Sequence, residues 1–180
     1  AMASLARSYA ALGDYDHALE LAGEAHRLLA DDPAASADTQ AMLAMLLNLQ
    51  ARHAEARDIA TRGLAQSAGA QPAADPATLG LLVELARAHW GLAEYDTAFN
   101  TLAFAQESTD GASSQSVLAA RATLLLLRAQ WHLQLLDLAA AERDLQDAAA
   151  AAPREASHLA DDIDEARLSL LLLQQRPPEA

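Results

Sequence analysis

The stretch LARSYAALGDYDHALELAGEA, residues 5–25, places a Gly-Asp pair between two runs of small and large residues. Gly is favoured just after the end of a helix, and Asp is favoured at the start of the next one. The runs on either side of Gly13 and Asp14 therefore predict two antiparallel helices joined by a tight turn.

The same arrangement recurs three times along the chain. With Ala18 as the anchor, Ala56, Ala98 and Ala141 occupy corresponding positions, at successive separations of 38, 42 and 43 residues. Each anchor is preceded at a fixed distance by a large residue followed by Ala, and is followed at a fixed distance by another small residue. The first column is Leu5-Ala6, Leu43-Ala44, Leu85-Ala86 and Arg128-Ala129, and the second is Ala25, Gly63, Ala105 and Ala148. Small residues in this register let the backbones of paired helices approach closely, which predicts a stack of helix pairs.

Composition also favours an all-α chain. Ala and Leu supply 80 of the 180 residues, whereas the strand-favouring Val and Ile supply only four. Periodicity and turn residues predict helices over residues 3–12, 15–29, 37–50, 53–66, 78–92, 95–107, 114–135, 138–151 and 155–174. The segments 67–76 and 108–114 are the clearest loops.

These repeats resemble the tetratricopeptide repeat family, whose unit is a helix-turn-helix. Its L-G-x-x-Y element corresponds to Leu5-Ala6-Arg7-Ser8-Tyr9 and Leu85-Ala86-Arg87-Ala88-His89, and its closing Pro to Pro153. The leading Trp of the family pattern is missing. The spacing is similar to the longer repeats of kinesin light chains and of bacterial multidomain signalling proteins. The resemblance implies a right-handed superhelical solenoid of about four antiparallel helix pairs plus a C-terminal helix.

The repeat units are expected at about residues 1–34, 35–75, 76–112 and 113–153, in one solenoid. Residues 154–176 would form a cap or part of a fifth unit. Because the sequence starts inside a helical pattern, we expect the chain to be part of a larger protein.

The formal net charge is −13, from 25 acidic against 12 basic residues, and every basic residue is Arg. This charge repels phosphate backbones and anionic lipids, so nucleic acid and membranes are not expected as partners, whereas a basic protein or peptide is. The longest strongly apolar runs, 124–127 and 170–173, are far shorter than the roughly 18 residues that indicate a membrane span. A cytoplasmic location is the default expectation, since no signal-like segment opens the sequence.

The sequence carries no motif for catalysis or cofactor binding. It has no phosphate-binding glycine loop, nucleophile elbow, dinucleotide-binding motif or HExxH motif, and no Cys. We therefore expect neither an enzyme nor a cofactor or metal site. The acidic run 161–165 is interpreted as a solvated helix face near a helix N-terminus, where the helix dipole favours acids, rather than as a cation site.

His89 and His132 occupy equivalent repeat positions next to Trp90 and Trp131. They could form a paired metal or base site, or pack between the two helices of a unit. The family resemblance favours packing, because this column lies between paired helices.

In the family, the first helix of each unit lines a concave groove. Mapping that wall onto this sequence gives the candidate partner-binding residues Arg7, Met45, Asn48, Arg87, Trp90 and Gln130, with Asp38, Leu49, Val83, Thr123, Leu126 and Gln134 among their neighbours. Arg87 beside Trp90 is the strongest candidate, because Arg and Trp are enriched where interfaces concentrate their binding energy. The alternative is that Trp90 only packs between units.

The leading functional hypothesis is a protein-protein interaction scaffold that binds a peptide or partner helix in this groove, within a multidomain regulatory protein. An alternative is self-association into a homodimer through the last predicted helix, whose apolar stripe comprises Leu159, Ile163, Leu170 and Leu173. A third hypothesis is a ligand-sensing domain that regulates an attached output domain.

Overall fold

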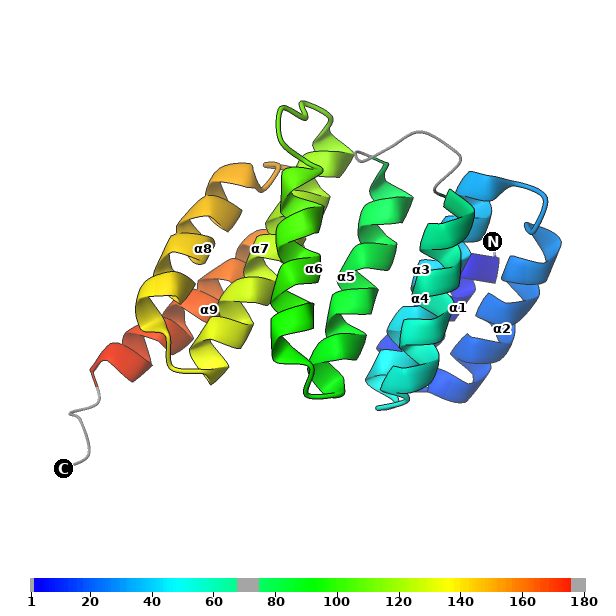
Figure 1. Cartoon of the computed structure of the whole chain (residues 1–180), viewed down its shortest axis with the longest axis horizontal. Coiled ribbons are helices and arrows are strands. Elements are labelled where there is room, and N and C mark those ends of the chain that lie inside the picture. Colours follow the sequence, from blue (N-terminus) through cyan, green and yellow to red (C-terminus); the bar gives the residue numbers. More distant parts are fainter. Residues whose placement is uncertain (1, 68–74, 176–180) are drawn as a thin grey trace. The chain divides into compact units, whose positions relative to one another are not determined.

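The computed structural model describes residues 2–67 and 75–175, and over these residues the regular structure is entirely helical (Figure 1). The chain divides into two compact units, Ala1–Ser108 and Thr109–Ala180. The first unit contains α1 (Met2–Ala11), α2 (Tyr15–Leu28), α3 (Pro33–Leu49), α4 (His53–Ser67), α5 (Pro76–Gly91) and α6 (Tyr95–Glu107). The second contains α7 (Gln115–Gln134), α8 (Leu138–Ala151) and α9 (Ser157–Gln174).

The predicted helix boundaries lie within two residues of these bounds, except at the start of α3, which comes four residues before the predicted position. The side chain of Asp32 explains the early start, because its Oδ1 accepts a hydrogen bond of 3.1 Å from the backbone N–H of Ala35. A carboxylate at this position satisfies one of the N–H groups that a helix start leaves unbonded.

One turn geometry joins the two helices of every pair. Gly13, Ala51, Ala93 and Leu136 have φ angles of 79°, 57°, 61° and 60°, and they are separated by the same intervals as the alanine anchors. In each turn the following residue donates its backbone N–H to a carbonyl five residues earlier, as from Glu94 to His89 at 2.9 Å and from Asp137 to His132 at 2.9 Å. This is the Schellman motif. Its recurrence confirms the repeat register that the sequence predicted.

The small residues of the repeat are buried. The anchors Ala18, Ala56, Ala98 and Ala141 and their first-helix counterparts Ala6, Ala44, Ala86 and Ala129 are all fully inaccessible to solvent. At Gly63, a Cβ atom would lie 2.7 Å from Oε1 of Gln40 and 2.9 Å from the methyl groups of Leu81. Because α4 contacts both α3 and α5, any larger residue at this position would require the side chains of Gln40 and Leu81 to shift.

The column of large residues is less buried than the small ones. Leu5 is 48% exposed, and the fourth member of the column, Arg128, forms two hydrogen bonds of 2.8 Å and 2.6 Å with the buried carboxylate of Asp144. A bidentate ion pair therefore joins α7 to α8 at a position where the other repeats carry Leu. Removing one partner of such a buried pair leaves an uncompensated charge, which destabilises a fold strongly.

The last helix, α9, packs on α7 and α8, and most of its apolar stripe is buried. Leu159, Ile163 and Leu170 are buried and Leu173 is partly buried, so the stripe suggested for self-association serves the core of the second unit instead. The leucines that α9 exposes are Leu168, Leu171 and Leu172, at 58%, 51% and 59%.

The left-handed turn residues give a test of the repeat geometry. Leu136→Gly should raise the free energy of unfolding by about 0.5–1 kcal/mol, because Gly adopts positive φ without steric strain. Leu136 is 67% exposed, so the substitution removes little buried surface. The measurement is urea denaturation followed by circular dichroism.

The control for this test is Leu135→Gly, because Leu135 is also exposed but has an ordinary φ of −85°. This variant should be no more stable than the wild type, because Gly there only adds flexibility to the unfolded chain. Equal effects of the two substitutions would contradict the assigned turn geometry.

Candidate partner-binding surfaces

In the first unit, the predicted groove residue Arg7 lies on α1 and forms an ion pair of 3.4 Å with Asp38 on α3. Both side chains are more than half exposed, so the pair contributes little to stability. Met45, also on α3, is partly buried and packs on the core cluster that contains Ala6 and Leu46. Arg7 is therefore accessible to a partner, whereas Met45 is largely occupied by packing.

Asn48 connects α3 to α5. Its Nδ2 donates to the backbone carbonyl of Glu84 at 2.9 Å and to the Glu84 carboxylate at 3.1 Å. Its Oδ1 lies 3.1 Å from Nδ1 of His53, and because an amide oxygen only accepts, Nδ1 is the donor. The predicted groove residue Asn48 thus has a structural role, with both ends of its amide engaged.

Glu84 is the residue in this region that sequence inspection missed. It is 8% exposed, and its carboxylate lies 3.6 Å from the guanidinium of the exposed Arg87. Burial raises the pKa of the Glu84 carboxyl, and this effect outweighs the lowering by Arg87 and by the hydrogen bond from Asn48. Asn48, Glu84 and Arg87 therefore form one connected polar group on α3 and α5.

Trp90 packs against α6. Its ring centroid lies 4.7 Å from that of Tyr95 and 6.1 Å from that of Phe99, both in α6. Such tilted and edge-on pairs stabilise helix packing beyond the area they bury. The aromatic contacts favour a packing role for Trp90 and leave Arg87 as the more accessible member of the predicted Arg-Trp pair.

The histidines in the equivalent repeat positions lie near acids of the following helix or of the turn before it. Nδ1 of His89 pairs with the Glu94 carboxylate, and the two ring nitrogens of His132 lie 3.8 Å from Asp137 and 3.7 Å from Asp144. Within the described residues, no group of three or more potential His, Cys, Asp or Glu ligands is placed to hold a metal ion.

Among the described helices, none is long and apolar enough to cross a membrane.

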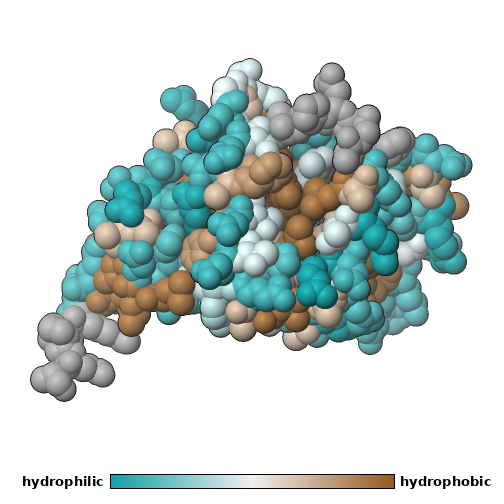
Figure 2. Space-filling view, viewed as in Figure 1, coloured by the Kyte–Doolittle hydropathy of each residue, from teal (hydrophilic) through white to brown (hydrophobic). Residues whose placement is uncertain are grey.

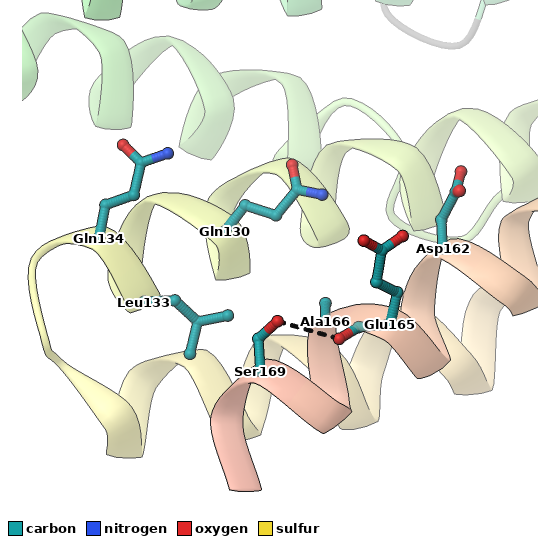
Figure 3. A pocket seen from close by; sticks show the side chains of 7 residues that line it. All are labelled: Gln130, Leu133, Gln134, Asp162, Glu165, Ala166 and Ser169. Carbon is teal, nitrogen blue, oxygen red and sulfur yellow. Dashed lines mark hydrogen bonds between the residues drawn. The ribbon is translucent and has the colours of Figure 1, made fainter. Parts of the chain in front are cut away.

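In the second unit, Gln130 lines a groove between α7 and α9 (Figure 3). The groove has a volume of about 310 Å³. Its α7 wall consists of Gln130, Leu133 and Gln134, and its α9 wall consists of Asp162, Glu165, Ala166 and Ser169. We call this site the α7–α9 groove.

The polar groups of the α7–α9 groove come from opposite walls. Figure 3 shows the carboxylate of Glu165 directed from α9 toward the Gln130 side of the groove, with the Asp162 carboxylate on the same wall. The Ser169 hydroxyl donates to the backbone carbonyl of Glu165 at 3.1 Å. Asp162, Glu165 and Ser169 share one helix face because their spacings of three and four residues match a helical turn.

Sequence inspection found both walls of this groove but did not join them. It placed Gln130 and Gln134 on the concave wall and assigned residues 161–165 to a solvated face. The signal that could have separated Asp162 and Glu165 from the rest of the acidic run is their spacing of three residues, which places them on one face, whereas Asp164 pairs with Arg167 at 3.2 Å.

Solved structures similar to this chain support the repeat architecture. BtubC (BKLC) from P. vanneervenii has a TM-score of 0.66 and 18% identity, over 99% of this chain and 82% of the other. A putative kinesin light chain with nearly identical TPR-like repeats from Podosopora anserina has a TM-score of 0.59 and 20% identity, over 98% of this chain and 96% of the other. The fold of this chain is thus TPR-like, as the resemblance implied. No protein-family model and no curated protein matches the sequence.

The buried carboxyl of Glu84 gives a prediction about pH. Because its pKa is higher in the folded than in the unfolded chain, its stabilising contribution is fully present below the unfolded value of 4.5 and is lost as the pH rises through the folded value. Glu84→Gln should therefore match the wild type in stability at pH 4 and exceed it at pH 7. Urea titrations at both pH values measure the difference.

The control for this prediction is Glu24→Gln, which removes the charge of an exposed glutamate on α2. The difference in free energy of unfolding between this variant and the wild type should not increase from pH 4 to pH 7 as it does for Glu84→Gln. A Glu84→Gln variant that is less stable than the wild type at pH 7 would show that the Arg87 ion pair outweighs the burial of the charge.

Proposed function

We propose that this chain is a protein-interaction module that binds a peptide or a partner helix along the first helices of its repeats, as part of a multidomain regulatory protein. The candidate contacts are Arg7 and Arg87 in the first unit and Gln130 in the second, with Met45, Asn48 and Trp90 supporting the helices that carry them. A basic partner suits the net charge of −13.

The observation that carries this proposal is the α7–α9 groove. It places the exposed amide of Gln130 opposite carboxylates of another helix, in a largely polar lining that also includes Leu133 and Ala166. Binding sites are usually concave, and a few convergent polar groups orient the ligand in them. In helical repeat proteins, stacked helix pairs create extended surfaces of this kind.

Blocking the groove tests this function. A random peptide library is selected against the immobilised chain, and each enriched peptide is measured by fluorescence anisotropy with the wild type and with Ser169→Trp. The indole should occupy the groove without changing its charge, and it should raise Kd by about tenfold or more, which corresponds to at least about 1.4 kcal/mol. The variant should remain folded, because Ser169 is exposed.

The matched control is Ser157→Trp, which places the same side chain at the exposed start of α9, outside the groove lining. Enriched peptides should bind this control as they bind the wild type. Peptides whose binding is unchanged by Ser169→Trp but is lost in Arg87→Ala would place the binding surface in the first unit. If none of these substitutions changed the Kd of the enriched peptides, the proposed binding surfaces would be wrong.

A second candidate function is self-association, which the exposed leucines of α9 favour. Leu168, Leu171 and Leu172 are each more than half exposed and lie on one helix face at spacings of three and four residues. Figure 2 shows apolar surface in the region where α9 ends. We propose that a second copy of the chain would associate through this leucine face rather than through the buried stripe that includes Leu159 and Ile163.

Light scattering across a concentration series tests self-association. The wild type should have twice the mass of one chain, and Leu168→Glu combined with Leu172→Glu should have the mass of a single chain, because charges in an apolar interface are unfavourable. Leu12→Glu alters a leucine that is 82% exposed outside α9 and should leave the mass unchanged. A monomeric wild type at all concentrations would exclude this function.

A further inference from the structure

We propose that the α7–α9 groove recognises an arginine side chain in a basic segment of a partner polypeptide, with Asp162 and Glu165 as the residues that select its charge. This inference rests on the proposed function and specifies the chemistry of the partner. It is carried by the shape of the groove, by the donors and acceptors on its two walls and by the charges around it.

The shape of the groove fits a long side chain with an apolar stem and a polar end. Leu133 and Ala166 supply the apolar part of the lining, where three methylene groups of an arginine can pack. A volume of about 310 Å³ accommodates one such side chain together with adjoining backbone. The polar groups lie on both sides of this apolar floor, as Figure 3 shows.

The acceptors of the groove match the donors of a guanidinium group. Arginine presents five N–H donors in one plane and has no acceptor. The carboxylates of Asp162 and Glu165 offer acceptors from α9, and the side-chain oxygens of Gln130 and Gln134 offer neutral acceptors from α7. A planar donor group between these walls can bond to both helices at once, which the single ammonium of lysine does less well.

Three arginines of the second unit pair with acids outside the groove lining: Arg121 with Asp110, Arg128 with Asp144 and Arg167 with Asp164. Within the described part of the chain, neither Asp162 nor Glu165 forms an ion pair. The facing residues on α7 are uncharged, so a cationic partner meets two carboxylates and no repelling arginine in the groove lining.

A partner side chain fits these residues better than a metal ion. The two carboxylates extend from neighbouring turns of one helix and face amides, whereas hard cations require several oxygens converging at short distance. A basic polypeptide also suits the overall charge of the chain, whose attraction for cations extends over about 10 Å at moderate ionic strength.

The test uses the peptides enriched against the wild-type chain. Enriched peptides should contain Arg, and replacing that Arg by citrulline, which keeps its shape but removes its charge, should raise Kd by about tenfold or more. Replacement by Lys should have a smaller effect. The double variant Asp162→Asn with Glu165→Gln should bind the Arg peptide as weakly as the wild type binds the citrulline peptide.

The charge-matched control is Glu142→Gln with Asp147→Asn, which removes two exposed carboxylates from α8, outside the groove lining. This control should keep Kd within about twofold of the wild-type value, because distant exposed charges are screened by salt. An equal loss in both double variants would show that net charge alone attracts the peptide, which would overturn the proposed arginine site.

A second measurement does not depend on peptide selection. In ¹H–¹⁵N spectra, N-acetylarginine methylamide should shift resonances of α7 and α9 in the wild type but not in the Asp162/Glu165 double variant, and the citrulline analogue should shift neither. Calcium chloride serves as the comparison cation. Absence of arginine-dependent shifts in the wild type, or shifts with Ca²⁺ alone, would overturn the inference.

Failure of this inference and failure of the proposed function give different results. Suppose that the enriched peptides lack Arg, that Ser169→Trp weakens their binding and that the Asp162/Glu165 double variant leaves their Kd unchanged. The groove would then still be the binding site, but the arginine assignment would be wrong. If Ser169→Trp also left Kd unchanged, the groove would not be the binding site.

Discussion

The close approach of paired helices is the constraint on which the rest of this structure depends. Alanines at the anchor positions and at the matching first-helix positions are fully buried, and a Cβ atom at Gly63 would require the side chains of Gln40 and Leu81 to shift. Helices that meet through such small residues lie near the lower limit of interhelical distance. The left-handed turns then return the chain directly, so the two helices of a pair are held in register.

This geometry divides each first helix into a buried and an available face. On α7, Ala129 is fully buried, whereas the long polar residues Gln130 and Gln134 line the groove with α9. In the first unit, the face of α3 and α5 that carries Asn48, Glu84 and Arg87 is joined by hydrogen bonds and an ion pair. In the first unit these polar side chains bond to one another, whereas in the groove of the second unit the carboxylates of Asp162 and Glu165 are exposed.

Much of the fold could be predicted from the sequence, because the repeat spacing follows from how two helices adjacent in the chain pack against each other. Small residues at fixed offsets recur in each helix pair, whereas the turn residue is Gly only in the first pair and the position after it is Arg52 rather than an acid in the second. The candidate site was less predictable. Trp90 was expected at a binding surface because of its type, but its ring contacts Tyr95 and Phe99, and an apolar periodicity on α9 could not distinguish a stripe that packs within the unit from one that faces a partner.

The sequence by itself determined the helices, their turns and the register of the small residues, because these follow from interactions between residues close in the chain. Only the tertiary structure decided which polar side chains meet. Glu84 became a buried carboxylate because α3 places Asn48 against it, and Asp162 and Glu165 became one wall of a groove because α9 packs beside α7. Such pairings depend on how helices distant in sequence are oriented around their axes, and a rotation of a few tens of degrees changes the neighbours without changing the sequence pattern.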